Sequence, residues 1–329
     1  MASSGPGCWW RSRSASNDDP AASSAGTAPS AGASPRTAVL PGRHFQREGR
    51  LLLPPDSHVH SQWSWDALTG SMEQTCVRAV ELGLPSLAFT EHADFTPWTL
   101  QGKDSEHIPT QWQPLVTGHV LTPPELDLNG YLECLKRCRE RFPTLHISSG
   151  IELSEPHWHD DRASQLLALG EFDRVLASVH SVAVADGLTE VSGAYRHRPP
   201  AEVVREYLAE TICMIEQFDA FEVLAHIDYP VRHWPTDAAP YEPHAFEDDY
   251  RNVLRALATA GKALEVNTKV PLHPQIVQWW RQEGGEAITF GSDAHDPAAL
   301  ANGFTDAAAM AEAGGFRPGR HPHDFWRRG

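Results

Sequence analysis

Several short apolar runs in this chain end in histidine or in a carboxylate. The first lies in DSHVHSQWSWDA (residues 56–67), where His58 and His60 are one residue apart and Asp66 follows. In an extended strand, residues i and i+2 point to the same face, so both imidazoles can reach one ion. Later runs end in Glu91, His92, Glu152, His180, His226, Asp228, Asp293 and His295. Imidazole nitrogen and carboxylate oxygen together suit zinc, manganese or iron, so the pattern predicts a shared site for divalent metal ions.

Each of these residues also has a structural interpretation. A single histidine at a strand end is more often hydrogen-bonded within the fold than bound to a metal, and HxH alone is a weak signal. Asp228 can satisfy the backbone of a turn before Pro230, and SDAH (292–295) can begin a helix with a capping carboxylate. Such roles would have to place polar residues at the same end of six strands by coincidence. The shared metal site explains all six ends at once.

The elements that must position these residues alternate along the chain. Helical patterns begin at Ser71 and Asn129 and cover 202–217 and 246–261. The apolar runs read as buried parallel strands over 51–54, 86–92, 145–152, 174–180, 221–228, 263–268 and 287–295. This alternation predicts a seven-stranded β/α barrel, in which the carboxyl ends of the strands share one rim. A doubly wound open sheet is the alternative.

Two segments depart from this rhythm. Residues 1–45 are rich in Ala, Ser, Gly and Pro, and we expect a disordered tail because little apolar surface is available for burial. The barrel would then occupy 46–329. Residues 94–128 carry several prolines and two tryptophans and show no clear periodicity. Long loops of this kind are usually functional or disordered, so we expect a lid over the barrel mouth.

Charge and hydropathy exclude several classes of protein. The chain of 329 residues has 43 acidic and 27 basic residues, for a formal net charge of −16. This balance argues against a protein that grips long nucleic acid, but a small phosphorylated substrate remains possible. No apolar run reaches the 18 or so residues of a membrane span, and the N-terminus has no apolar signal core. We therefore expect a cytoplasmic protein, and the sequence leaves its oligomeric state open.

The motifs HVH, FTEH, GIE, SVH, AHID and GSDAH occur here in that order. This ordered set resembles the PHP (polymerase and histidinol phosphatase) superfamily, and most of all its histidinol-phosphatase branch, over residues 51 to about 315. The resemblance implies a distorted (β/α)7 barrel with three metal ions. It assigns His58, His60, Glu152 and Asp293 to the first ion, Glu152, His180 and His226 to the second, and Asp66, His92 and His295 to the third.

The same resemblance implies the supporting and catalytic roles. Many relatives have histidine at the position of Asp66, and Glu91 stands where the family more often has aspartate. Glu91 and Asp228 would support the ligands from behind, while Glu152, Asp293 and His180 would be catalytic. A hydroxide shared by two metals that Glu152 bridges would attack phosphorus, which makes the expected activity that of a phosphomonoesterase, with L-histidinol phosphate as the implied substrate.

Two other functions stay open at this point. One is a PHP-type phosphodiesterase or exonuclease that acts on nucleotides or short oligonucleotides. The other is a metal-stabilised interaction domain without catalysis. The nearly complete set of ligands makes the second less attractive, because loss of function would be expected to erase ligands first.

Phosphate binding requires cations near the metal site. We expect Lys269 first, because it follows a strand end directly, and the further candidates are Arg196, Arg198 and Arg232. EPHWH (155–159) adds His157 and His159 just after Glu152. These two histidines could line the substrate pocket or carry a proton to the leaving group. A solvated surface loop is the alternative interpretation.

Overall fold

The computed structural model describes residues 46–47, 50–51, 53–100, 108–185 and 187–329. The predicted tail, 1–45, lies outside these ranges. The chain divides into two compact units, Met1–Leu51 and Leu52–Gly329. In the described part of the first unit, β1 (Gln46–Arg47) pairs antiparallel with β2 (Arg50–Leu51). All other elements belong to the second unit.

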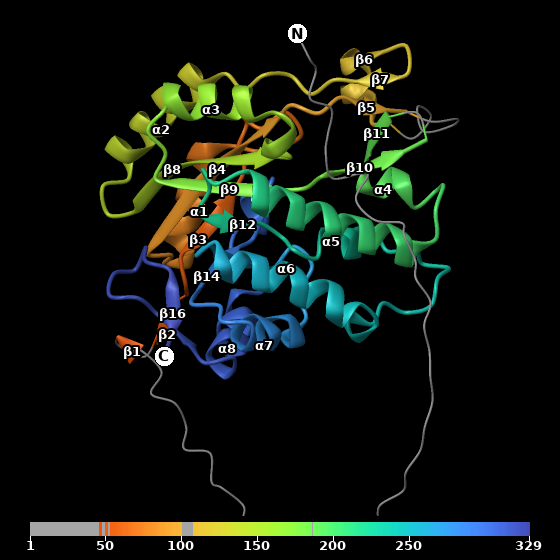
Figure 1. Cartoon of the computed structure of the whole chain (residues 1–329). Coiled ribbons are helices and arrows are strands. Elements are labelled where there is room, and N and C mark those ends of the chain that lie inside the picture. Colours follow the sequence, from red (N-terminus) through yellow and green to blue (C-terminus); the bar gives the residue numbers. More distant parts are fainter. Residues whose placement is uncertain (1–45, 48–49, 52, 101–107, 186) are drawn as a thin grey trace, which may run out of the picture. The chain divides into compact units, whose positions relative to one another are not determined.

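A mixed α/β fold is built around one curled sheet (Figure 1). Among the described residues this sheet has nine strands in the order β15-β16-β14-β13-β12-β9-β8-β4-β3. The parallel strands are β3 (Asp56–Val59), β4 (Ser86–Asp94), β8 (His146–Ser154), β9 (Arg174–Ser178), β12 (Val223–Leu224), β13 (Ala263–Asn267) and β14 (Ala287–Gly291). Two antiparallel strands, β15 (Phe316–Arg317) and β16 (Trp326–Arg328), follow β14 at the edge.

The first and last parallel strands meet at their carboxyl ends. Val59 and Ala294 form a parallel bridge, in which the His60 amide donates to the Ala294 carbonyl at 2.9 Å. The Asp293 amide donates to the His58 carbonyl at the same distance. An open doubly wound sheet leaves its edge strands apart, so that alternative does not describe this fold.

The helices cover the outside of the sheet. They are α1 (Met72–Leu82), α2 (Leu128–Arg141), α3 (Asp160–Leu169), α5 (Pro200–Gln217), α6 (Glu247–Thr259), α7 (Pro274–Gln282) and α8 (Phe304–Ala313). Ser71 caps α1 as predicted, because its side chain accepts from the Gln74 amide. The second helix begins two residues earlier than predicted, since Asp127 rather than Asn129 caps it and accepts from the Gly130 amide at 3.0 Å.

The first strand differs most from the prediction. It covers Asp56–Val59 rather than 51–54. Pro54 and Pro55 have no amide hydrogen, so they cannot complete a ladder in the sheet interior, and pairing begins after them. The fifth strand was predicted over 221–228, but only Val223–Leu224 pair as a strand. The chain leaves the ladder there, before it reaches His226.

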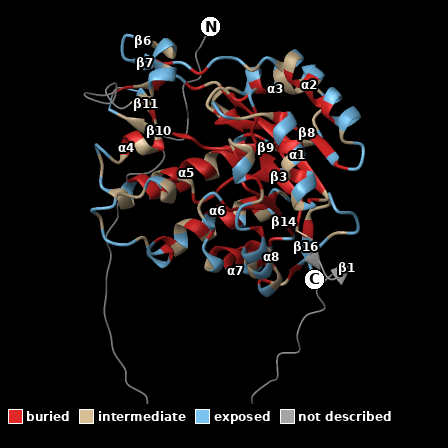
Figure 2. Cartoon of the chain, turned by 180° about the vertical axis from the view of Figure 1, so that it is seen from behind, coloured by how far each residue is buried: buried red, intermediate tan, exposed pale blue. Residues whose placement is uncertain are grey.

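Most of the strand residues are buried, while the helices expose one face to solvent (Figure 2). The larger apolar core lies between the sheet and α5 to α8, with Trp279, Trp280 and Tyr207 among its fully buried side chains. A second core packs α1 and α2 on β3, β4 and β8. Within the described ranges, no helix combines the length and apolar composition needed to cross a membrane.

Residues 94–128, predicted to be a lid loop, form a small structured subdomain where they are described. Strands β5 (Trp98–Thr99), β6 (Val116–Thr117) and β7 (Val120–Leu121) make an antiparallel sheet beside the 3-10 helix Thr110–Leu115. This sheet lies next to the hairpin of β10 (Ser181–Val184) and β11 (Gly187–Glu190), which leads into α4 (Val191–Ala194) (Figure 1). Gly187 has φ +148°, and a Cβ there would lie 2.4 Å from Thr99 Oγ1, so the contact requires glycine.

Candidate metal centre

The Glu152 carboxylate lies at the centre of the predicted ligand set. It is fully buried near the end of β8, opposite His92 of β4 in the parallel register. Within the described part of the chain, five imidazoles surround it, with nitrogen to oxygen distances of 2.8 Å for His226, 3.1 Å for His58 and His92, and 3.4 Å for His60 and His180. Strands that are far apart in sequence therefore deliver their end residues to one point, as the predicted barrel rim requires.

Hydrogen bonds behind His58 and His60 orient both rings. His58 Nδ1 lies 2.7 Å from Glu265 Oε1, and a carboxylate can only accept, so this nitrogen carries the proton. His60 Nδ1 contacts Ser64 Oγ at 2.9 Å. The Ser64 hydroxyl donates its one proton to Glu91, so it accepts from His60. In the neutral rings that metal binding requires, both Nε2 atoms therefore carry lone pairs.

These two Nε2 atoms face each other at 3.0 Å. Two acceptors at this distance cannot bond to each other, but a cation between them would bind both. His180 repeats the arrangement: its Nδ1 lies 2.6 Å from Ser154 Oγ, whose proton goes to Asp94. The His180 Nε2 atom then points toward His226 Nε2, 3.4 Å away, and toward Glu152. We call His58, His60, Glu152, His180 and His226 the inner cluster.

A second group lies closer to solvent. His295 Nε2 is 3.1 Å from Asp66 Oδ2, and His92 Nε2 is 3.5 Å from Asp66 Oδ1. The side chains of Asp66 and His295 are 22% and 21% exposed, whereas those of the inner cluster are at most 7% exposed. We call Asp66, His92 and His295 the outer cluster. Asp66 lies on the loop after β3 rather than on a strand.

The donor chemistry of both clusters fits divalent metal ions. Candidate ligand atoms fall into groups within 4.8 Å of one another, which include His58–His60–Glu152, Glu152–His180–His226 and His60–His92–His295. Asp293 completes the first group, with Oδ1 3.5 Å from His60 Nε2 and 4.0 Å from His58 Nε2. Neutral imidazoles and buried carboxylates of this kind suit zinc, manganese or iron.

Electrostatics keep the central carboxylates ionised. Burial raises the pKa of Glu152, but the neighbouring imidazoles of His58, His180 and His92 outweigh burial and hold that pKa well below its usual range. Burial acts on Asp293 in the same direction, and Arg232 and Lys269 reverse it, so its pKa also lies well below the usual range. Both groups are therefore available as anionic ligands at neutral pH.

The predicted phosphate-binding residues do not all reach the site. Arg232 Nη2 lies 2.6 Å from Asp293 Oδ2, Lys269 Nζ lies 3.4 Å from Asp293 Oδ1, and Arg196 lines the same pocket. Arg198 instead pairs with Glu206 and donates to the Ala183 carbonyl.

His157 and His159 were placed beside the pocket by their position in sequence, and neither lines it. Glu155 adopts a left-handed conformation, with φ +43°, and turns the chain there. His157 Nε2 contacts Glu210 of α5 at 2.7 Å, and His159 Nε2 contacts Thr96 Oγ1 at 2.9 Å. His157 and Arg198 lie outside the pocket, so their positions do not support a role in phosphate binding.

Supporting residues include some that the sequence analysis named. Glu91 accepts from the amide and hydroxyl of Ser61 and from the Ser64 hydroxyl, so it holds the loop behind His60. Asp228 is buried before a 3-10 helix, and burial raises its pKa to about 6. No side-chain hydrogen bond joins Asp228 to a ligand among the described residues, so its supporting role stays a prediction.

Other supporting residues were missed. Glu265 bonds His58 Nδ1 and accepts from the His226 amide at 2.8 Å, and Asp94 accepts from Ser154 behind His180. Glu265 is the one charged residue in the strand ALEVN, and Asp94 lies two residues after His92 in a strand. In both strands, the two-residue periodicity places these carboxylates on a buried face, and the sequence analysis could have identified them from this pattern.

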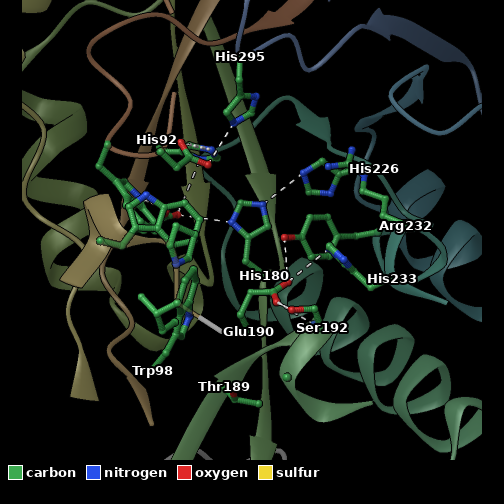
Figure 3. A pocket seen from close by; sticks show the side chains of 18 of the residues that line it. His92, Trp98, His180, Thr189, Glu190, Ser192, His226, Arg232, His233 and His295 are labelled. Atoms are coloured by element: carbon green, nitrogen blue, oxygen red, sulfur yellow. Dashed lines mark hydrogen bonds and ion pairs between the residues drawn. The ribbon is translucent and has the colours of Figure 1, made fainter. Parts of the chain in front are cut away.

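A cavity of about 260 Å³ opens beside the two clusters. His92, His180, His226 and His295 line one side of it, near Arg232 (Figure 3). A second wall is aromatic and carries Trp65, Trp98 and Trp112, and the Trp65 indole donates to Asp94 at 2.7 Å. Glu190 and Ser192 lie at a third side, next to His233 (Figure 3). The pocket therefore joins a metal-binding wall, an apolar wall and three cations, Arg196, Arg232 and Lys269.

The PHP domain family matches residues 56–269, which include most of the ligand-bearing strand ends. The chain belongs to this family. A histidinol-phosphatase from Lactococcus lactis is 28% identical over 251 residues, or 73% of this chain and 83% of that protein. A protein named "Probable histidinol-phosphatase" from Thermotoga maritima is 25% identical and covers 76% of this chain and 88% of that one.

A solved structure shares the fold of this PHP protein. It is histidinol phosphate phosphatase from Lactococcus lactis, complexed with zinc, L-histidinol and phosphate. The match covers 81% of this chain and 95% of that chain, with a TM-score of 0.67 and 24% sequence identity. At this identity the likeness establishes the architecture.

Proposed function

We propose that this PHP protein is a metal-dependent phosphomonoesterase that hydrolyses L-histidinol phosphate to L-histidinol and phosphate. The observation that carries the proposal is the pair of facing Nε2 atoms on His58 and His60 beside the Glu152 carboxylate. This arrangement leaves lone pairs unsatisfied unless a cation is bound. The histidinol-phosphatases of similar sequence support the choice of substrate.

Three ions would occupy the centre. His58, His60, Glu152 and Asp293 would hold the first ion, Glu152, His180 and His226 the second, and Asp66, His92 and His295 the third. When bound, divalent ions of this kind lower the pKa of water toward neutrality and neutralise charge on a phosphoryl group. Glu152 would bridge two of them, and Glu265, Ser64 and Ser154 hold the ligand rings in the required tautomers. Seven parallel strands among the described residues support the finer interpretation of the sheet as a distorted (β/α)7 barrel.

The cations beside the centre would orient the phosphate. The Arg232 side chain is 10% exposed and held against Asp293, so its guanidinium is fixed in the pocket wall without a large cost in side-chain entropy. Lys269 lies on the other side of Asp293, with Nζ 3.2 Å from His295 Nδ1. Together with Arg196, these groups would bind phosphate oxygens and stabilise the charge that develops as the ester bond breaks.

The remaining walls suit a leaving group that is both planar and cationic. The Trp65 ring centroid lies 5.7 Å from that of Trp98 and 5.0 Å from that of Trp112, which makes a continuous indole surface. Glu190 supplies a carboxylate, fixed by the Tyr229 hydroxyl at 3.1 Å and by the Ser192 amide at 2.8 Å. An aromatic wall and a fixed carboxylate would bind an imidazole and an ammonium group.

A phosphate-release assay over a panel of esters tests the proposal. The purified protein, loaded with zinc or manganese, is assayed with L-histidinol phosphate, p-nitrophenyl phosphate, sugar phosphates and nucleotides, and in parallel with bis-p-nitrophenyl phosphate. We expect the highest kcat/KM for L-histidinol phosphate. Activity on the diester alone would overturn the proposal in favour of a phosphodiesterase, and bound metal without hydrolysis of either class would favour an interaction domain.

A further inference from the structure

A second charged hollow, of about 480 Å³, lies at the other end of the strands. Arg174 is the first residue of β9, and Arg327 of β16 pairs with Ala287, the first residue of β14. His180, in contrast, lies two residues beyond the last residue of β9, which places it about 20 Å from Arg174 at about 3.3 Å per residue. The hollow is therefore separate from the metal centre. Its lining comes from Arg174 and from the C-terminal residues Arg320, His323, Asp324, Phe325 and Arg327.

Two of the three arginines flank one aromatic ring. The Arg174 guanidinium carbon lies 4.2 Å from the Phe325 ring centroid, and that of Arg327 lies 5.9 Å from it. Stacking on a ring restricts the rotation of a long side chain, so part of the entropy cost of binding is already met. The fold thus orients Arg174 and Arg327 before a ligand binds.

The positive charge of the hollow is only partly neutralised. Arg174 has a side chain that is 11% exposed and contacts Glu222 through Nη1 at 3.4 Å, but its buried Nε has no hydrogen-bond partner. Neither Arg320 nor Arg327 has a side-chain hydrogen bond or ion pair to any other described residue. Asp324 is the carboxylate in the lining, and it accepts from the His321 amide at 2.8 Å.

Three guanidinium groups, against Asp324 in the lining and Glu222 beside Arg174, leave an excess of one positive charge at one spot of a chain whose net charge is −16. Arginine forks match the oxygen geometry of phosphate and carboxylate groups. His323 adds a further donor, and its ring stacks on His146 at 4.3 Å between centroids.

We infer that this hollow is a second ligand site, which binds a compact polyanion carrying phosphate or carboxylate groups. The site is independent of the hydrolytic chemistry at the metal centre. Arg174 would contact the anion through the part of its guanidinium that lines the hollow, while Arg320 and Arg327 would bind it from the C-terminal segment.

Isothermal titration of the metal-loaded protein tests this inference at about 150 mM salt, where long-range charge effects are screened. Two trianions serve as probes, trimetaphosphate for the phosphate type and benzene-1,3,5-tricarboxylate for the carboxylate type. We expect one binding event that Arg320→Glu with Arg327→Glu weakens at least about tenfold, as two lost guanidinium contacts require. Binding of a probe at the metal centre should be unchanged in the double variant, so it is measured there as a separate binding event.

The matched control is Arg78→Glu with Arg205→Glu, which changes the net charge equally on the exposed faces of α1 and α5. Hydrolysis of p-nitrophenyl phosphate and the thermal midpoint show that each variant is folded, so loss of binding is not confused with loss of the proposed activity. Binding of one probe alone identifies the ligand type. Equal affinities in the two double variants, or no binding of either probe to the unmodified protein, would overturn the inference.

Discussion

The inner and outer clusters hold the same kinds of ligand in different ways. The inner rings are buried, and for His58, His60 and His180 the far nitrogen is bonded to a buried group, namely Glu265, Ser64 and Ser154. In the outer cluster, Asp66 and His295 are each about one-fifth exposed, and Asp66 lies on a loop. His295 Nδ1 lies 3.0 Å from the main-chain carbonyl of Asp293 rather than from a buried carboxylate.

This difference implies a difference in metal affinity. A ligand whose orientation is fixed by a buried hydrogen bond loses little entropy when the metal binds, and the charge behind it strengthens its basicity. A ligand on an exposed loop must be ordered when the metal binds, and this ordering costs conformational entropy. We therefore expect the inner ions to bind more tightly and to exchange more slowly than the outer ion.

The largest effect should come from Glu152→Gln, which removes the charge that the inner ions share. We expect the metal content to fall by about two ions and hydrolysis to fall by about 1,000-fold, equivalent to about 4 kcal/mol of transition-state stabilisation. Elemental analysis and a phosphate-release assay measure the two effects. Glu210→Gln is the control, since this buried carboxylate bonds His157 outside the pocket and should leave both values unchanged. Full metal content in the Glu152 variant would contradict the proposed centre.

An intermediate effect is expected for Glu265→Gln, which keeps the shape of the side chain but removes the charge behind His58. Loss of such a partner typically weakens metal binding by about 10- to 100-fold. Titration with a competing chelator measures the affinity, and Glu283→Gln makes the same change in a carboxylate that pairs with Arg251 and Arg255 on the surface. If the Glu265 variant binds the metal as tightly as the Glu283 variant does, then burial alone orients the His58 ring, and the hydrogen bond to Glu265 is not needed.

The smallest effect is expected for Asp66→Asn in the outer cluster. One ion should be lost, while hydrolysis should fall by less than about tenfold because the inner ligands and their partners stay in place. Metal stoichiometry and kcat are the measurements. Asp66→His, in contrast to Asp66→Asn, places a metal ligand at this position, so this variant should bind the third ion. A loss as large as that for Glu152→Gln would show that the two clusters act as one unit.

Two of the predicted pocket residues lie elsewhere. Arg198 was a candidate cation and His157 was considered because it follows Glu152 closely, yet both pair with glutamates of α5. Sequence distance from a strand end does not determine where a loop side chain points. At His157 the deciding feature is the left-handed backbone of the preceding Glu155, a conformation that residue type alone does not indicate.

The missed residues have a different cause. Glu265 and His58 are separated by 207 positions, and their hydrogen bond depends on β13 and β3 both reaching the same interior. Periodicity describes which face of one strand is buried, but it does not show which side chains from distant strands meet. For the same reason, the sequence did not show that Trp65, Trp98 and Trp112 form one aromatic wall of the pocket.

The linear sequence by itself determined the order of strands and helices and the chemistry at the strand ends, because periodicity, caps and strand alternation are local properties of the chain. Only the tertiary structure decided which nitrogen of each imidazole faces the centre, which cations reach the pocket and which arginines meet at the opposite end of the strands. These depend on hydrogen bonds and packing between residues far apart in the chain, whose energies exist only after the sheet has curled and its ends have met.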